Sequence, residues 1–133
     1  MGTQQLFLAA LTMIIILQAR LATSSRRMVD VKNELSQKIL IAHCGSKDDD
    51  LEAHVVLVGS SLRWRFGSVR DTLYWCNMAV EDRRLSFTAY DGNDVHISRH
   101  DVSWAVRDDG AHLLNRDGSE EQSYRREWSR NNG

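Results

Sequence analysis

The sequence lacks an excess of charge of one sign, contains no proline, and has no apolar run long enough to span a membrane. Its 17 Lys and Arg residues balance 18 Asp and Glu residues, and the basic residues are scattered rather than gathered in a stripe with aromatic side chains. This balance does not favour nucleic acid or an anionic membrane as a partner. The absence of proline decides little by itself. At 133 residues, of which 42% are hydrophobic, the chain has the material for one folded domain.

The N-terminal segment predicts secretion. Residues 6–17 form an uncharged apolar run, too short to cross a bilayer, which needs about 20 residues, but suited to the core of a signal peptide. Cleavage after Ser24 would leave Ala22 and Ser24 at the two small-residue positions. No Lys or Arg precedes the run, so only the amino terminus supplies positive charge; a membrane anchor and a buried helix are the alternatives. We expect residues 1–24 to be a signal peptide and the mature protein to be extracellular and not inserted in a membrane.

Only two cysteines are present, Cys44 and Cys76. In an oxidising compartment an even number of cysteines favours a disulfide, and the alternative is a pair of inert buried thiols. A bond between them would close a loop of roughly 33 residues and stabilise the fold by on the order of 3.5–4 kcal/mol in the chain-entropy model. We expect this bond to join two facing layers of the fold.

Alternation of apolar and polar residues predicts an all-β fold. Leu62, Trp64 and Phe66 share one face of a strand whose other face is polar and charged. Residues 38–44 are apolar on both faces and are therefore expected near the centre of a sheet. Further strands are expected at residues 28–32, 53–58, 72–78, 85–90, 95–97, 102–107 and 111–114. About eight short strands at this spacing, with turn signals between them, indicate a β-sandwich or a barrel.

The composition changes after Asn115. Residues 116–133 are mostly charged or small, and only Tyr124 and Trp128 are able to anchor them. We expect residues 25–115 to form the folded domain and residues 116–133 to form a frayed, flexible tail or a short helix.

No arrangement of residues predicts catalysis or metal binding. His43, Cys44 and His54, or His96 and His100, lack the spacing of a zinc site. The three consecutive aspartates lack the alternating acidic pattern and central glycine of a calcium loop. The glycine pattern of a hydrolase nucleophile elbow is also missing. We therefore expect no enzyme activity, no cofactor and no metal.

Exposed aromatic side chains are the remaining functional candidates. Trp64 and Trp104 lie on apolar faces and are expected in the core, whereas Trp75 is ambiguous between packing and surface recognition. A module that binds carbohydrate or cell wall would use Trp75 and Tyr90.

Five short motifs, taken in order, resemble the plant self-incompatibility S-protein homologue family. They read HCGSKDDDL at residues 43–51, WRF at 64–66, TLYWC at 72–76, FTAYD at 87–91 and WAVRDDG at 104–110. Each motif alone is weak, but their common order and spacing over residues 29–115 are specific.

The resemblance implies a small secreted plant protein with an antiparallel β-sandwich, disulfide support and no catalytic residues. The founding members are stigma-secreted ligands that cause rejection of self pollen through a pollen receptor, and most homologues have no assigned role. This chain departs from the family in lacking a further cysteine pair in its C-terminal half, so residues 95–114 are expected to be less constrained. It also has no Asn-x-Ser/Thr site, so N-glycosylation is not expected.

Together these features predict a monomeric extracellular ligand that binds a cell-surface protein on another cell through loops on a rigid scaffold. The loops are residues 45–52, 81–84 and 91–94. The candidate recognition residues in them are Ser46, Lys47, Asp48, Asp49, Asp50, Glu81, Asp82, Arg83, Arg84, Asp91, Asn93 and Asp94.

Overall fold

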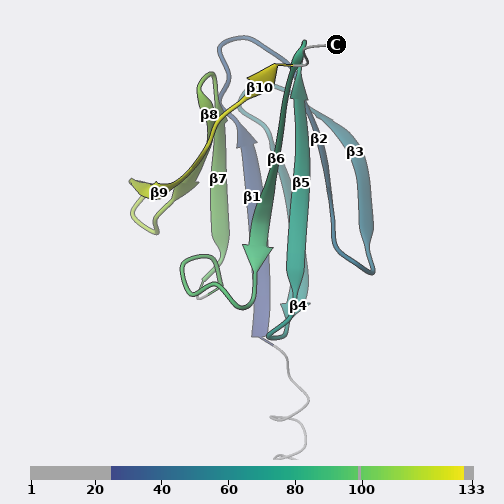
Figure 1. Cartoon of the computed structure of the whole chain (residues 1–133), viewed down its shortest axis with the longest axis vertical. Helices are drawn as coiled ribbons and strands as arrows, with labels where there is room; N and C mark the ends of the chain where they lie inside the picture. Colours follow the sequence, from purple (N-terminus) through teal and green to yellow (C-terminus); the bar gives the residue numbers. More distant parts are fainter. Residues whose placement is uncertain (1–24, 99, 131–133) are drawn as a thin grey trace, which may run out of the picture.

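The computed structural model describes residues 25–98 and 100–130 and folds them into two five-stranded β-sheets (Figure 1). The sheet orders are β4-β1-β7-β8-β9 and β10-β6-β5-β2-β3. The strands are β1 (Ser25–Asn33), β2 (Leu40–Gly45), β3 (Asp50–Val56), β4 (Ser61–Ser68), β5 (Leu73–Val80), β6 (Arg83–Asp91), β7 (Val102–Arg107), β8 (Gly110–Leu114), β9 (Glu120–Arg126) and β10 (Ser129–Arg130). The predicted signal peptide at residues 1–24 lies outside the described residues.

The all-β sandwich with one disulfide is confirmed, with ten strands in the described residues where about eight are expected. The pairing is antiparallel except between β1 and β7, which run parallel. Within residues 25–98 and 100–130, no helix is both long and apolar enough to pass through a membrane.

Alternating side chains from both sheets form one core. Tyr74 and Met78 of β5 are buried as predicted, because every second side chain of the strand faces inward. Trp104 of β7 is also buried, and its indole N–H donates a hydrogen bond to the carbonyl oxygen of Ala89 in β6, 3.0 Å away. Its ring lies 4.7 Å from the ring of Phe87. These contacts join the two sheets through one residue.

The disulfide links neighbouring strands of one sheet. Cys44 and Cys76 are bonded, with their Cα atoms 4.1 Å apart, so the predicted bond is confirmed. They are directly opposite each other in β2 and β5, and both are fully buried. The prediction that the bond joins two facing layers is wrong, because both side chains leave the same face of the same sheet.

Residues 95–97 form a turn instead of the predicted strand. The Asp94 carboxylate accepts a hydrogen bond from the backbone N–H of His96, and the Asp94 carbonyl accepts one from Ile97. Such local bonding by aspartate competes with strand pairing. Ile97 is nevertheless buried, so the turn contributes an apolar side chain to the core.

The C-terminal segment forms strands β9 and β10 where the sequence suggests a flexible tail or a short helix. β9 pairs with β8, and β10 crosses to pair with β6 in the other sheet. Trp128 anchors the crossing by donating its indole N–H to the carbonyl oxygen of Arg107 at 2.9 Å. The polar composition of the C-terminal segment does not predict these strands. Their pairing uses backbone groups and leaves most of the described side chains in solvent.

A cluster of polar side chains lies in the C-terminal half of the chain, which has no cysteine after Cys76. His112 is 5% exposed, with Nε2 2.6 Å from Oδ1 of Asp109 and Nδ1 3.3 Å from Oε2 of Glu120. Glu120 also pairs with Arg107. The cluster connects β7, β8 and the start of β9, so hydrogen bonds and the Arg107–Glu120 ion pair constrain this part of the sandwich, which no disulfide links.

Candidate recognition surface

The solvent-facing side of the β10-β6-β5-β2-β3 sheet, called the outer face below, carries an apolar row. Ile41 of β2 is directly opposite Val55 of β3 on one side and Ala79 of β5 on the other. Ile41 and Val55 are 46% and 67% exposed, and Ile39 beside them is 56% exposed. Apolar side chains therefore meet across three adjacent strands, and the large aliphatic ones, at β2 and β3, face water.

The exposed row modifies the prediction for residues 38–44. β2 does have a neighbour on each side, as expected. Only Leu40, Ala42 and Cys44 face the core, whereas Ile39 and Ile41 lie on the outer face. The apolar content of both faces therefore reflects an uncovered surface rather than burial on both sides. The apolar residues on the second face of this strand are the one feature of the sequence that indicates the exposed outer face.

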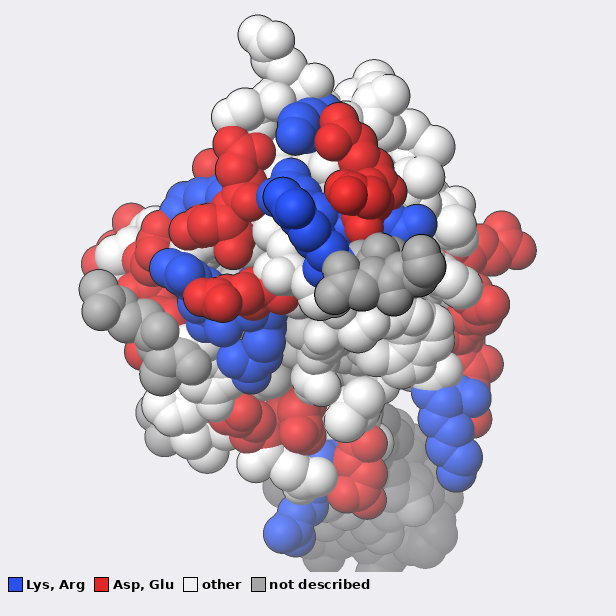
Figure 2. Space-filling view, turned by 45° about the horizontal axis from the view of Figure 1, so that its top comes forward, with Lys and Arg blue, Asp and Glu red and all other residues white. Residues whose placement is uncertain are grey.

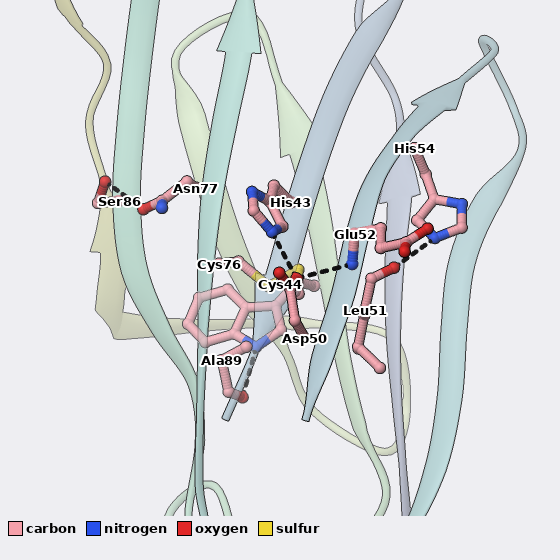
Figure 3. The surroundings of a disulfide bond; sticks show 11 residues. His43, Cys44, Asp50, Leu51, Glu52, His54, Cys76, Asn77, Ser86 and Ala89 are labelled. Carbon is pink, nitrogen blue, oxygen red and sulfur yellow. Dashed lines mark hydrogen bonds and ion pairs between the residues drawn. A yellow bond between two sulfur atoms is a disulfide. The ribbon is translucent and has the colours of Figure 1, made fainter. Parts of the chain in front are cut away.

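A polar pair follows the apolar row along β2. Nε2 of His43 lies 2.6 Å from Oδ1 of Asp50, and Figure 3 shows the imidazole pointing toward that carboxylate beside the disulfide. The hydrogen bond from His43, followed by one from the backbone N–H of Glu52, lowers the pKa of Asp50 from its ordinary value. The ring of His43 also meets the indole of Trp75 edge-on, with centroids 5.3 Å apart. The carboxylate of Asp50 therefore makes contacts within the fold, although it was predicted to be a recognition residue.

A groove opens beyond Trp75 at the end of the sandwich. It has a volume of about 640 Å³ and is called the loop groove below. It is lined by Ser46, Lys47, Asp48, Asp49, Gly67, Val69, Asp71, Thr72, Leu73, Tyr74 and Trp75. It lies between the turn that joins β2 to β3 and the turn that joins β4 to β5.

Hydrogen bonds within each turn fix the two walls of the loop groove. The backbone N–H of Ser46 donates to the carbonyl of Asp49 at 2.7 Å, and the Ser46 hydroxyl accepts from the N–H of Asp49 at 3.1 Å. Val69 and Thr72 make the same reciprocal pair in the other turn, with both distances 3.0 Å. The walls are therefore held by their own backbone before any partner binds.

Tyr74 closes the inner side of the loop groove. Its ring is buried against Phe66, with centroids 4.6 Å apart. Burial raises the pKa of the Tyr74 hydroxyl, and the charges of Asp49 and Asp48 raise it further, against a hydrogen bond with Ser46 that lowers it. The hydroxyl thus remains neutral beside the acidic wall.

A second hollow, of about 410 Å³, lies at the other end of the outer face. It is called the upper hollow below and is lined by Gln37, Lys38, Ile39, Ile41, Ala79, Glu81 and Arg84. Lys38 and Glu81 form an ion pair at its rim, with Nζ and Oε2 3.7 Å apart. β2 and β5 run between the two hollows (Figure 1), and the facing polar residues His43 and Asn77 lie between the apolar row and Trp75.

The structure divides the predicted recognition loops between the two ends of the molecule. Residues 91–94 lie with the loop groove, because the N–H of Gly92 donates to the carbonyl of Thr72 at 2.7 Å. A side chain at Gly92 would meet the carbonyl oxygens of Val69 and Arg70 at 2.6 Å, so this approach requires glycine. Residues 81–84 lie at the opposite end (Figure 1). The three loops therefore do not form one patch.

Several predicted recognition residues make contacts within the fold. Arg83 donates to the carbonyl of Asp108 at 2.8 Å and stacks over Trp128. The Asp94 carboxylate accepts a hydrogen bond from the Tyr124 hydroxyl at 2.7 Å, and this bond lowers the pKa of Asp94. Lys47, Asp48 and Asp49 instead extend into solvent at the rim of the loop groove.

Of the two aromatic candidates for carbohydrate binding, only Trp75 remains. Tyr90 is 1% exposed, so its predicted surface role is wrong. A register shift between Tyr74 and Trp75 changes the alternation in β6, so that Ala89 and Tyr90 are both buried. Trp75 is half-buried and lines the loop groove.

The surface visible in Figure 2 has no large area of charge of one sign. Figure 2 shows Lys and Arg interspersed with Asp and Glu at the end that carries the upper hollow, and an uncharged area next to them. In the part of the chain that the structure describes, no three His, Cys, Asp or Glu side chains converge to hold a metal ion. Apolar and shape features therefore distinguish the outer face more than net charge does.

Comparison of sequences finds relatives of this chain among plant proteins. Residues 28–128 match the family model described as plant self-incompatibility protein S1. S-protein homolog 2 of Arabidopsis thaliana is 32% identical over 95 residues, which span 65% of this chain and 59% of the relative. S-protein homolog 29 of the same plant is 30% identical over 90 residues, which span 65% of this chain and 67% of the relative.

Comparison of structures supports the fold. A solved structure of self-incompatibility protein homologues superimposes with a TM-score of 0.59 over 81% of this chain and 97% of that one, at 14% sequence identity. That work describes its proteins as a widespread family of small, highly stable, secreted proteins from plants. At this identity the likeness shows a common sandwich fold.

Proposed function

Because this chain belongs to the plant self-incompatibility protein S1 family, whose model matches residues 28–128, we propose that it is a non-enzymatic extracellular ligand for a cell-surface protein. The resemblance in the sequence motifs is thereby confirmed, and the family is one of secreted plant proteins. The signal it carries would be developmental, defensive or part of pollen–stigma recognition. The receptor would lie on another cell.

The outer face is the observation that carries this proposal. Monomeric soluble proteins rarely leave a group of large aliphatic side chains exposed unless the patch has a function. Here Ile39, Ile41 and Val55 are exposed together on β2, its preceding residue and β3, and the buried disulfide fixes β2 to β5 on the other side. A rigid apolar surface loses little conformational entropy when a protein partner covers it, which favours affinity.

Binding to living cells tests the proposal. The labelled mature protein is expected to bind plant protoplasts saturably, and unlabelled protein and prior protease treatment of the cells should both remove the signal. Ile41→Lys should abolish binding, since it places a charge in the centre of the apolar row. Val95→Lys is the matched control, because Val95 is similarly exposed (57%) but lies in the loop between β6 and β7.

Two results would contradict the proposal. One is the absence of saturable, protease-sensitive binding, and the other is binding by Ile41→Lys equal to that of the unmodified protein. Both variants must show the thermal unfolding midpoint of the parent, which is expected for exposed positions. Turnover on esterase, glycosidase and nuclease substrates would overturn the non-enzymatic part of the proposal.

A carbohydrate-binding module is the second candidate, and the position of Trp75 favours it. Its half-buried indole lines the loop groove beside Asp48 and Asp71, and aromatic rings with nearby polar groups suit sugar recognition. A glycan array with the parent protein and Trp75→Ala tests this role. Glycan binding that is lost in the variant would support the module and count against a protein partner.

A further inference from the structure

The loop groove combines an apolar floor with an acidic rim. Leu73 and Val69 are 43% and 62% exposed, and Trp75 continues the apolar surface toward β2. Asp48 and Asp49 stand on one wall and Asp71 on the other. Lys47 is the one cation among the lining residues. The groove therefore offers apolar contact at its base and a net negative charge at its opening.

The fold does not neutralise these carboxylates. Among the described residues, none of Asp48, Asp49 and Asp71 takes part in an ion pair. Arg70, next to Asp71 in sequence, donates instead to the side-chain oxygen of Asn93 at 3.3 Å. Asp50, in contrast, is paired with His43. Asp71 accepts a hydrogen bond from the side-chain amide of Asn93 at 3.4 Å, and Asp49 interacts with the Tyr74 hydroxyl, but both of these partners are neutral. The three carboxylates therefore have no counter-charge within the described part of the fold.

We infer that the loop groove binds a basic segment of the protein partner, in which a Lys or Arg side chain lies next to an aliphatic residue. The inference rests on the proposed function, because it assumes a protein partner. The aliphatic residue and the methylene stem of the cation would pack on Leu73 and Val69. The charged head would reach the carboxylates of Asp48, Asp49 or Asp71, and the face of Trp75 would add a cation–π contact.

The geometry favours this occupant over an acidic or a wholly apolar one. An acidic segment would meet three aspartates and one lysine at the rim. An apolar segment would bury the carboxylates without a counter-charge, which is costly. The turns are fixed by their internal hydrogen bonds, so the charges already stand in place.

Fluorescence anisotropy with defined peptides tests the inference. The probes are a labelled peptide of alternating Arg and Leu and a second peptide in which Glu replaces every Arg. The mature protein should bind the basic peptide, bind the acidic one far more weakly, and lose affinity as salt is added. The double variant Asp48→Asn/Asp49→Asn should weaken binding of the basic peptide at least about threefold.

Asp82→Asn is the matched control, because Asp82 is an exposed aspartate in the turn between β5 and β6, away from the loop groove. It should leave the affinity unchanged, and thermal unfolding should show that all variants are folded. The inference is overturned if the basic peptide does not bind at about 1 mM, a concentration that detects even weak complexes. It is also overturned if the acidic peptide binds as well, or if the double variant behaves like the control.

The cell-binding experiment separates this inference from the proposed function. If Asp48→Asn/Asp49→Asn binds protoplasts like the parent while Ile41→Lys does not, the groove inference fails and the ligand proposal stands. If the parent protein shows no saturable binding, the ligand proposal fails whatever the peptides do. If neutral glycans bind, Trp75→Ala abolishes that binding and the aspartate variant retains it, the groove is a sugar site and the basic-segment inference is wrong.

Discussion

The indole of Trp75 covers Gly45. A Cβ atom at position 45 would stand 2.8 Å from Cζ2 of Trp75 and 2.9 Å from the carbonyl oxygen of Asp49. Gly45 is the last residue of β2 and is directly opposite Trp75 in the sheet. The missing side chain lets the indole lie over the strand and form one side of the loop groove. The shape of the groove therefore depends on a residue that contributes no side chain to it.

Gly45→Ala should destabilise the protein by about 1–3 kcal/mol, the usual cost of an added methyl group in a packed site. Chemical denaturation measures the loss. Part of the clash is with Trp75, so the same substitution should cost less in a Trp75→Ala background, although the contact with Asp49 remains. An equal cost in both backgrounds would show that the indole does not occupy the space above position 45.

Removing the disulfide should destabilise the protein strongly. Cys44 and Cys76 are separated by 32 residues, and a loop of that size corresponds to about 3.7 kcal/mol in the chain-entropy model. Cys44→Ala/Cys76→Ala should therefore lower the midpoint of thermal unfolding by roughly 10–20 °C. Reductant should lower the midpoint of the parent toward that of the variant and leave the variant unchanged. A variant that melts with the parent would refute a stabilising role for the bond.

Asn33 should be intolerant of replacement by aspartate. Its side chain is fully buried and donates two hydrogen bonds, to the carbonyls of Lys38 at 2.9 Å and Val56 at 2.8 Å. Its Oδ1 accepts a hydrogen bond from the backbone N–H of Leu35 at 2.9 Å. Asn33→Asp keeps the size of the side chain but removes both donors and buries a charge, so we expect a loss of about 3–5 kcal/mol.

Denaturation at two pH values checks the Asn33 prediction. Protonation of the new carboxyl group restores one donor and removes the charge, so the variant should recover part of its stability relative to the parent at acidic pH. Asn77→Asp is the control, because Asn77 is exposed on the outer face. A similar small effect at both positions would contradict the bridging role of Asn33.

Tyr124→Phe should raise the pKa of Asp94. The hydrogen bond from the Tyr124 hydroxyl is the main cause that holds the pKa of Asp94 below its ordinary value of 3.8. The same bond raises the pKa of Tyr124 above 10.0. Carboxyl NMR titration should show the Asp94 pKa moving upward in the variant. The pKa of Asp109, which is lowered mainly by His112, should stay where it is.

The Asp94–Tyr124 bond also predicts the sign of a pH effect on stability. A lowered carboxyl pKa contributes stability above the unfolded value, and this contribution is lost as pH falls through the folded value. A raised tyrosine pKa contributes stability below its unfolded value and loses it as pH rises through the folded one. The stability difference between parent and Tyr124→Phe should therefore be largest between about pH 5 and 9 and shrink at either extreme. A difference that is constant with pH would argue against this bond.

Local patterns were sufficient for much of the fold. The alternation in β4, β5 and β7 predicted the buried faces of Phe66, Cys76 and Trp104 correctly, because successive side chains of a strand point to opposite faces of the sheet. The pattern failed for Tyr90, where a register shift interrupts the period. It also failed for residues 95–97, where hydrogen bonds of Asp94 stabilise a turn.

The recognition surface was predicted only in part. The acidic turn at residues 46–49 was identified from its charge, but the second wall of the loop groove, with Val69 and Asp71, was not. Val69 and Asp71 belong to the turn between β4 and β5. Only the packing of the two sheets brings this turn next to the acidic turn between β2 and β3. The apolar faces of residues 38–44 predicted a place near the centre of a sheet but did not predict that Ile41 is exposed. A sequence shows that a face is apolar but does not show whether another layer packs on it.

By itself, the sequence determined the secondary structure of most strands, the family and the pairing of two cysteines, because each depends on local periodicity, motif order or the number of thiols. The tertiary structure decided that the disulfide lies within one sheet, that β9 and β10 complete the two sheets, and that one apolar sheet face stays open to solvent. These features depend on which strands become neighbours. Strand neighbours are set by backbone pairing over long distances in the chain, which side-chain patterns do not record.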